Sequence, residues 1–184
     1  MNSEEATDES LMLAYGDGDL KAFEVLYGRH KGPLYRFILR QCGNTSIADE
    51  LFQDVWGRLV KARENYRVSA KFKTWLYQIA QNRLIDYYRK ESSRKASSHS
   101  SSPLEELLVD EGEQPEVRAE LNEKALTLMR CVENLPASQK QAFLLKQEAG
   151  LSLGEIAEVM GVNAETAKSR LRYALQKLRS ELND

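Results

Sequence analysis

Residues Gly150–Leu178, GLSLGEIAEVMGVNAETAKSRLRYALQKL, carry the clearest local signals for secondary structure. Within this stretch, Ser152-Leu153-Gly154-Glu155 has the pattern of a capping box. In this motif the serine side chain accepts a hydrogen bond from a first-turn amide, and the glutamate side chain accepts one from the backbone amide of the serine. Gly161 is placed to end that helix in the left-handed conformation. Asn163 can cap a second helix two residues later. The order helix, glycine-containing turn, helix predicts a DNA-binding helix-turn-helix.

The second helix of this pair has a clear division between its faces. Its apolar stripe is expected to consist of Ala167, Leu171, Leu175, Leu178 and Leu182. The residues that face outward combine hydroxyl side chains with long cationic ones, and both kinds can bond phosphates and base edges. These residues are Thr166, Lys168, Ser169, Arg170, Arg172, Tyr173 and Lys177. An αα-hairpin with a basic surface has the same periodicity, so that alternative stays open.

The rest of the chain also shows helical periodicity, with no sustained period-two alternation. We therefore expect an all-α protein of two small helical domains, residues 8–92 and 116–182. Between them, 93–115 is rich in serine and acids, and this composition buries too little apolar area to offset its ordering entropy. It predicts a flexible linker, with at most a transient helix around Leu104–Val109.

Caps and prolines set the expected helix boundaries in the first domain. Asp19 is a plausible N-cap, and Pro33 is expected to start or kink a continuation of that helix. Thr45 or Ser46 can cap the next helix. A further helix is expected from about Phe72 to Arg89.

The net charge of −2 conceals strong segregation along the sequence. Residues 58–95 carry eleven lysines and arginines against three acids, and five cations lie within 168–179. Residues 96–123 between them carry eight acids against Arg118. Grouped cations are what a polyanion binder needs, because each neutralised phosphate releases counterions. Two solvated helix faces of an ordinary protein would give the same pattern.

The first basic segment also interleaves aromatic residues with its cations. Aromatic faces stack on unpaired bases while cations follow the backbone, so this composition is typical of a single-strand binder. The aromatic residues are Tyr66, Phe72, Trp75, Tyr77, Tyr87 and Tyr88. The alternative is that most of them belong to the hydrophobic core.

A third segment, Ala48–Trp56, combines acids with large aromatics. An apolar stripe through Leu51 and Val55 leaves its acids outside. Such a surface suits a protein partner, since aromatics anchor interfaces. A capped helix N-terminus, where acids complement the dipole, explains the acids equally well.

Composition excludes several classes of protein. No apolar run approaches the roughly 20 residues that cross a bilayer, and the acidic N-terminus lacks a signal-peptide pattern. Two cysteines and two histidines, with no ligand cluster, predict neither a disulfide framework nor a metal site. No Gly-rich phosphate loop or nucleophile–base set occurs. We expect no enzyme activity and no cofactor, and a cytoplasmic location.

Together these segments resemble a bacterial sigma factor of the extracytoplasmic-function (ECF) group, over about residues 10–92 and 117–180. Ala48–Trp56 is similar to the polymerase-binding helix of the second sigma region. Phe72–Asn82, followed by Asp86 and Arg89-Lys90, is similar to its promoter-melting helix. Leu135-Pro136 opens a block that resembles the fourth region, whose helix-turn-helix matches Gly150–Leu178.

The resemblance implies a transcription initiation factor that gives core RNA polymerase its promoter choice. Contacts with the clamp of the largest subunit are implied for Asp49, Glu50, Phe52, Gln53, Asp54 and Trp56. Contacts with the minus-ten element are implied for Asn65, Arg67, Lys71, Lys73, Trp75, Asn82, Arg83, Asp86, Arg89 and Lys90. The outward residues of the helix-turn-helix would read the minus-thirty-five element as duplex DNA.

The resemblance also implies further partners. The flap of the polymerase is a second docking site in this group, and the loop about Asn65–Lys71 would hold a flipped base. The group is commonly controlled by an anti-sigma factor, which can hold the complex near the membrane without membrane insertion of this chain. We expect few contacts between the two domains unless such a partner clamps them together.

Three other functions compete with this interpretation. A transcriptional regulator could carry the same DNA-binding domain behind a sensor, but residues 1–92 show no alternating strand–helix pattern. An all-helical interaction module without DNA contacts is the second, and an enzyme is the third.

Overall fold

The computed structural model describes residues 6–95 and 115–183, and these ranges contain helices and no strand. The all-α prediction is confirmed. The first block consists of α1 (Asp8–Gly16), α2 (Leu20–Cys42), α3 (Thr45–Ala62), a 3-10 turn η1 (Arg63–Asn65) and α4 (Phe72–Lys95). The second block consists of α5 (Pro115–Glu133), α6 (Ala137–Gln147), α7 (Leu153–Met160) and α8 (Ala164–Asn183). The Leu104–Val109 segment lies outside the described residues.

Two boundary predictions in the first block need correction. Asp19 caps α2 as expected, and α2 continues through Pro33, so no new helix starts there, whereas a kink at Pro33 stays a prediction. Burial of Leu34 and Phe37 offsets the hydrogen bond that the proline removes. The N-cap of α3 is Asn44, whose side chain accepts from the Ile47 amide at 3.0 Å, so Thr45 and Ser46 lie inside the helix.

The helix-turn-helix boundaries are confirmed. Ser152 and Glu155 form both hydrogen bonds of the capping box. Gly161 ends α7 with φ at 64°, a left-handed conformation that costs glycine least. Asn163 Oδ1 accepts from the Thr166 amide at 2.7 Å.

The apolar stripe of α8 was only partly predicted. Ala167, Ala174 and Leu178 are buried, whereas Leu175 is 40% and Leu182 46% exposed. The expected stripe included Leu175 because leucine is large and apolar. A spacing of seven residues from Ala167 returns to the same helix face almost perfectly, and this favours Ala174.

Helix α1 was not predicted. Thr7 caps it, and Met12 is fully buried between it and the rest of the first block. Gly16 lets its C-terminal end approach η1, because a Cβ there would lie 2.9 Å from the Arg63 carbonyl oxygen. The apolar residues of α1 are consecutive, from Leu11 to Tyr15, so they produce no helical stripe in the sequence.

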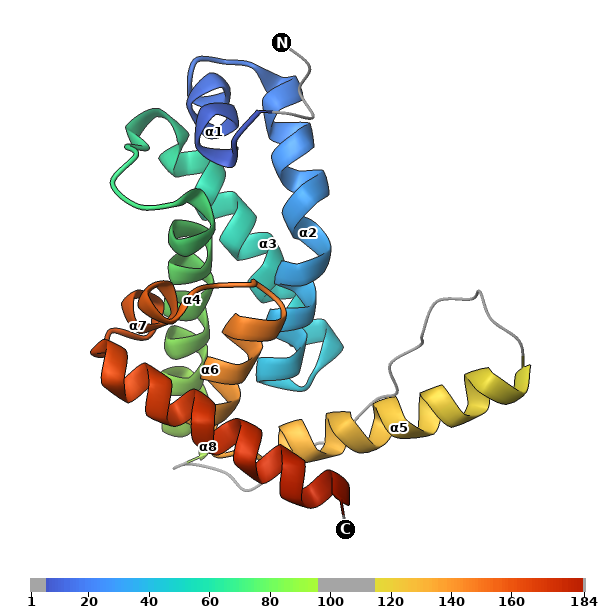
Figure 1. Ribbon diagram of the computed structural model, residues 1–184. Coiled ribbons are helices and arrows are strands. Elements are labelled where there is room, and N and C mark those ends of the chain that lie inside the picture. Colours follow the sequence, from blue (N-terminus) through green and yellow to red (C-terminus); the bar gives the residue numbers. More distant parts are fainter. Residues whose placement is uncertain (1–5, 96–114, 184) are drawn as a thin grey trace.

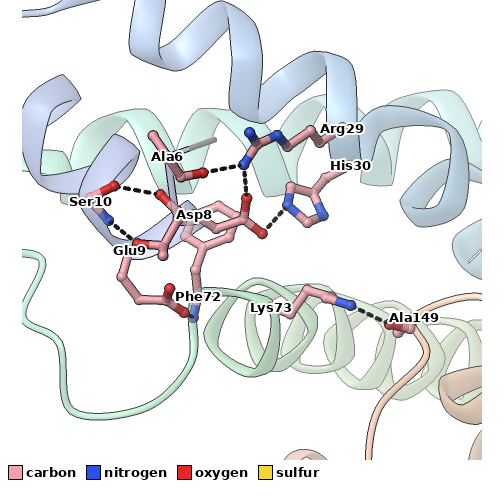
Figure 2. Close-up of polar contacts among 10 residues, drawn as sticks. Ala6, Asp8, Glu9, Ser10, Arg29, His30, Phe72, Lys73 and Ala149 are labelled. Carbon is pink, nitrogen blue, oxygen red and sulfur yellow. Dashed lines mark hydrogen bonds and ion pairs between the residues drawn. The ribbon is translucent and has the colours of Figure 1, made fainter. Parts of the chain in front are cut away.

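Asp8 ties α1 to α2 (Figure 2). Its carboxylate contacts Arg29 Nη1 at 2.8 Å and His30 Nε2 at 2.7 Å. Burial raises the pKa of Asp8, but the hydrogen bonds from His30 and Arg29 outweigh it and lower this pKa overall. The stabilisation is therefore complete above the unfolded pKa of about 3.9 and is lost as the pH falls through the lower folded pKa.

We expect Asp8→Asn to lower the free energy of unfolding by about 1 kcal/mol at neutral pH, because charge-assisted hydrogen bonds are lost. The loss relative to wild type should shrink as the pH falls below about 4. Urea unfolding at several pH values measures both effects. An equal loss at pH 3 and pH 7 would contradict the assignment.

The two blocks pack against each other, so the prediction of few contacts between them is wrong. In the part of the chain that the structure describes, α7 lies against α4 and α6 against α2 (Figure 1). Helix α5 instead extends away from the first block, with its C-terminal part near α8. Cations of the first block form ion pairs with carboxylates of the second at this contact. Because the paired residues are far apart in sequence, the pairs produce no local periodicity from which the contact could be predicted.

Candidate polymerase and nucleic-acid interfaces

The acidic surface of α3 is built by its apolar stripe. Because Leu51 and Val55 are buried, Asp49, Glu50 and Gln53 are exposed on the opposite face. Tyr35 on α2 donates its hydroxyl to Asp49 at 2.8 Å. Burial and the nearby Asp49 carboxylate raise the pKa of Tyr35. This hydrogen bond orients Asp49 while leaving it open to solvent.

Two residues of the predicted clamp-binding set have structural partners. Asp54 pairs with Arg83 of α4. Trp56 is only 6% exposed and packs edge-on against Tyr27, with ring centroids 4.9 Å apart. Phe52 is half-buried beside them. The surface that a partner can reach thus consists of exposed polar groups above a packed aromatic row.

The predicted minus-ten residues divide by exposure. The exposed members are Asn65, Arg67, Lys71, Asn82, Arg89 and Lys90. Lys73, Trp75 and Asp86 are half-buried. The exposed residues place amides and cations at the loop before α4 and along α4, which is compatible with contacts to a nucleic-acid backbone.

Arg83 does not share this exposure. It is 8% exposed, pairs with Asp54 and lies 3.6 Å from an Asp86 carboxylate oxygen. A guanidinium enclosed in this way fixes α4 to α3. In this conformation Arg83 cannot reach DNA, so it does not belong to the proposed DNA surface.

Most aromatic residues of the first basic segment belong to the core. This favours the alternative that they stabilise the fold over the prediction that they stack on bases. Tyr66, Phe72 and Tyr77 are at most 4% exposed. Burial, with the nearby Glu9 and Asp8 charges, raises the pKa of Tyr66 to about 12. Trp75 is partly buried against Tyr66, with ring centroids 4.9 Å apart. Tyr88 remains 43% exposed.

Helix α1 contributes a residue that no sequence pattern indicated. Glu9 Oε1 accepts a hydrogen bond of 2.7 Å from the Phe72 amide at the first residue of α4 (Figure 2). The carboxylate satisfies an amide that has no partner within the helix and complements the helix dipole. Glu9 therefore fixes where α4 begins, directly after the predicted base-holding loop.

We expect Glu9→Ala to lower the free energy of unfolding by about 1 kcal/mol, as the loss of a helix cap does. Amide hydrogen exchange at Phe72 and the next residues should accelerate. Glu24→Ala, at an exposed position of α2, is the matched control and should change neither. Unchanged exchange in Glu9→Ala would show that the cap contributes nothing.

The outer face of α8 carries the third candidate interface. Lys168, Arg172 and Tyr173 are exposed, and the Arg172 guanidinium lies 5.0 Å from the Tyr173 ring centroid. Thr166, Ser169 and Arg170 are half-buried. Lys177 donates to the Asn134 carbonyl at 3.0 Å and so holds α8 to the end of α5.

The first turn of α7 is held by Glu155. Hydrogen bonds from the Ser152 backbone and side chain, and from Lys71, lower the pKa of Glu155 to about 2 against a smaller opposing effect of burial. The Lys71 Nζ lies 3.0 Å from Glu155 Oε1. A predicted minus-ten cation is therefore paired with the capping residue of the helix-turn-helix.

Neither metal ligation nor membrane insertion finds support in the described residues. No group of three or more His, Cys, Asp or Glu side chains that could hold a metal occurs among them. None of their helices has the length and hydropathy to span a bilayer. Cys42 and Cys131 are free thiols.

Comparison with known proteins matches both blocks. Residues 26–94 match the family model of sigma-70 region 2, and residues 125–178 match that of sigma-70 region 4. The chain is 28% identical to the ECF RNA polymerase sigma factor SigW of Bacillus subtilis, over 91% of this chain and 92% of the relative. It is 27% identical to the ECF RNA polymerase sigma-E factor of Haemophilus influenzae, over 98% and 97%.

Solved structures show the same fold. RpoE of Bartonella quintana, in complex with the anti-sigma factor NepR, superposes with a TM-score of 0.74 at 20% identity, covering 89% of this chain and 98% of that one. CnrH, in complex with the cytosolic domain of CnrY, superposes with a TM-score of 0.68 at 22% identity, covering 96% and 97%.

Proposed function

Since this chain belongs to the ECF group of sigma-70 factors, we propose that one of its three exposed surfaces binds polymerase and the other two recognise promoter DNA. The protein is a transcription initiation factor that binds core RNA polymerase and directs it to promoters. The first block is its region 2 and the second its region 4. Region 2 carries two of the proposed surfaces, and region 4 carries the third.

Helix α3 is the proposed docking surface for the clamp of the largest polymerase subunit. The exposed Asp49, Glu50 and Gln53 supply charge and hydrogen-bonding groups. Phe52 supplies apolar area beneath them. The buried Trp56 and the half-exposed Asp54, paired with Arg83, hold the helix in place. Acids at this surface repel nucleic acid, which favours a basic protein partner.

The loop before α4 and the exposed side of α4 form the proposed minus-ten surface. Asn65 and Arg67 lie at the start of the loop, and Val68 after them is 57% exposed, so an unstacked base can find both polar and apolar contacts there. Lys71, Lys73, Arg89 and Lys90 follow the backbone. Extruding a base costs a few kcal/mol, and contacts in this loop must offset that cost.

Helix α8 is the proposed minus-thirty-five reader. Its exposed Lys168 and Arg172 lie past the Asn163 cap, at the end of the helix that enters the major groove in this motif. Arginine can pair bidentately with guanine. Lysine can bond a backbone phosphate through its ammonium group. A contact of region 4 with the polymerase flap belongs to the same proposal.

We also propose that an anti-sigma factor controls the protein. The solved structures of RpoE and CnrH each contain the similar chain bound to a second protein. Action on core polymerase puts the protein in the cytoplasm when it works. It has no catalytic role of its own in this scheme, because polymerase performs the chemistry.

The observation that carries the assignment is the order of three surfaces: an acidic helix, a basic loop and helix, and a basic helix-turn-helix. Its test is transcription in vitro with core polymerase, the full chain and a genomic template library, followed by mapping of RNA 5′ ends. Start sites should share two sequence elements at fixed spacing. Core polymerase alone is the control, and identical start sites with and without the chain would overturn the proposal.

A further inference from the structure

Contacts between the two blocks share one arrangement of charge. Along α2 and α4, side chains of region 2 donate hydrogen bonds, and oxygen atoms of region 4 accept them. The pairs are Arg36 and Arg40 with Glu148, Lys71 with Glu155, Lys73 with the Ala149 carbonyl, and Gln78 with Glu158. Region 4 thus presents its acceptors to a row of donors on region 2.

Glu148, at the end of α6, is the most enclosed of these acceptors. Its side chain is only 7% exposed, and both carboxylate oxygens are used. Arg36 Nε lies 2.8 Å from Oε2, and the Arg40 guanidinium bonds Oε1. Two guanidinium groups around one oxyanion are the arrangement by which proteins bind phosphate.

The arginine pair continues into the proposed minus-ten surface. Lys73 Nζ donates to the Ala149 carbonyl at 3.1 Å, one residue after Glu148 (Figure 2). Lys71 bonds Glu155 at 3.0 Å further along the same contact. A row of cations therefore runs from Arg40 on α2 to Lys71 before α4. The turn between α6 and α7 and the start of α7 pair with it, while Arg36 and Lys71 stay 51% and 75% exposed.

The contact includes a group that opposes closure. The Tyr77 hydroxyl is buried and has no hydrogen-bond partner among the described residues. Burial raises its pKa, and so does the charge of Glu148, whereas the charge of Arg36 lowers it. A buried hydroxyl without a partner favours a conformation in which water can reach it. The ion pairs offset this cost beside the apolar packing of the two blocks, and salt and competing anions weaken them.

We propose that Arg36 and Arg40 extend the minus-ten surface as binding sites for DNA backbone phosphates, and that Glu148 occupies their site in the free chain. Closure of region 4 on region 2 and binding of DNA to this face then exclude each other. The proposal rests on the proposed function, because it adds residues and a control to the same DNA surface.

The first test compares single-stranded DNA binding by the full chain and by Glu148→Gln. Removing the carboxylate frees the arginine pair, and a chain that is closed nine-tenths of the time gains about tenfold in affinity when it opens. The probe is a fluorescein-labelled 20-nucleotide strand of mixed sequence, followed by anisotropy at low and moderate salt. Glu24→Gln, the same charge change at an exposed position of α2, should leave affinity unchanged.

A second variant separates phosphate binding from opening. Arg36→Ala combined with Arg40→Ala also breaks the contact, so small-angle scattering should show a larger radius of gyration for it and for Glu148→Gln than for wild type. Glu148→Gln should gain more affinity for DNA than the double variant, in which opening frees Lys71 and Lys73 from their partners but the two arginines are absent. If the double variant gains as much, the arginines do not bind phosphate; if neither variant expands, Glu148 does not hold the blocks together.

These outcomes are distinguishable from failure of the proposed function. A chain that directs initiation with core polymerase but shows neither effect retains its function and loses this inference. A chain that fails in transcription loses the functional assignment itself, whatever its DNA affinity. Circular dichroism and thermal melting establish that each variant is folded before binding is compared.

Discussion

Glu50→Lys is expected to weaken binding of the full chain to core RNA polymerase about tenfold or more while leaving its stability unchanged. Glu50 is exposed on α3, and it lies on the proposed docking face. A like charge facing a basic partner costs several kcal/mol at an interface, and 1.4 kcal/mol already corresponds to tenfold in affinity. Titration of a labelled chain with core enzyme measures the change.

Asp54→Lys provides the contrast on the same helix. Asp54 is paired with Arg83, whose side chain is 10% exposed, so its reversal puts two cations side by side. Because Asp54 itself is 46% exposed, solvent screens the pair, and we expect a loss of about 1 kcal/mol, less than a fully buried pair would give. Asp86, 3.6 Å from Arg83, offsets part of this loss.

The pair of variants therefore distinguishes docking from folding. Glu50→Lys should change affinity alone, and Asp54→Lys should lower the midpoint of chemical unfolding. Wild-type affinity in Glu50→Lys would argue against α3 as the docking surface. Wild-type stability in Asp54→Lys would show that the pair of Asp54 with Arg83 contributes little to the free energy of unfolding.

Local signals made most of the helix-turn-helix predictable. The capping residues of this motif each satisfy a backbone group only a few residues away, so sequence spacing alone predicts their roles. They are Ser152, Glu155, Gly161 and Asn163. Exposure of Lys168 and Arg172 followed from helical period alone. The stripe of α8 was harder, because size favoured Leu175 where geometry places Ala174 in the core.

Contacts between distant residues account for the features that no sequence pattern revealed. Asp54 and Arg83 are 29 positions apart, and Arg40 and Glu148 are 108 apart. Neither pair leaves a periodic pattern, so the sequence shows neither that Arg83 is held by Asp54 nor that Arg40 meets Glu148. Glu9 was likewise interpreted only as part of an acidic terminus, since its role depends on the position of Phe72.

Arg172→Ala is expected to relax promoter choice at one base position of the minus-thirty-five element. A bidentate contact to guanine discriminates by about 1–3 kcal/mol, which corresponds to roughly 5- to 150-fold between the preferred base and its competitors. The side chain is exposed and lies against the adjacent Tyr173, so the fold should not suffer. Initiation by holoenzyme on templates randomised at each upstream position measures the preference.

Two further alanine variants make that result specific. Lys168→Ala, if Lys168 holds a phosphate, should weaken all templates alike and reduce the salt dependence by about one ion. Arg179→Ala removes an equal charge near the end of α8, outside the proposed reading surface, and should behave as wild type. A uniform loss in Arg172→Ala would make Arg172 a phosphate contact, whereas no loss at all would argue that α8 does not enter the groove with this face.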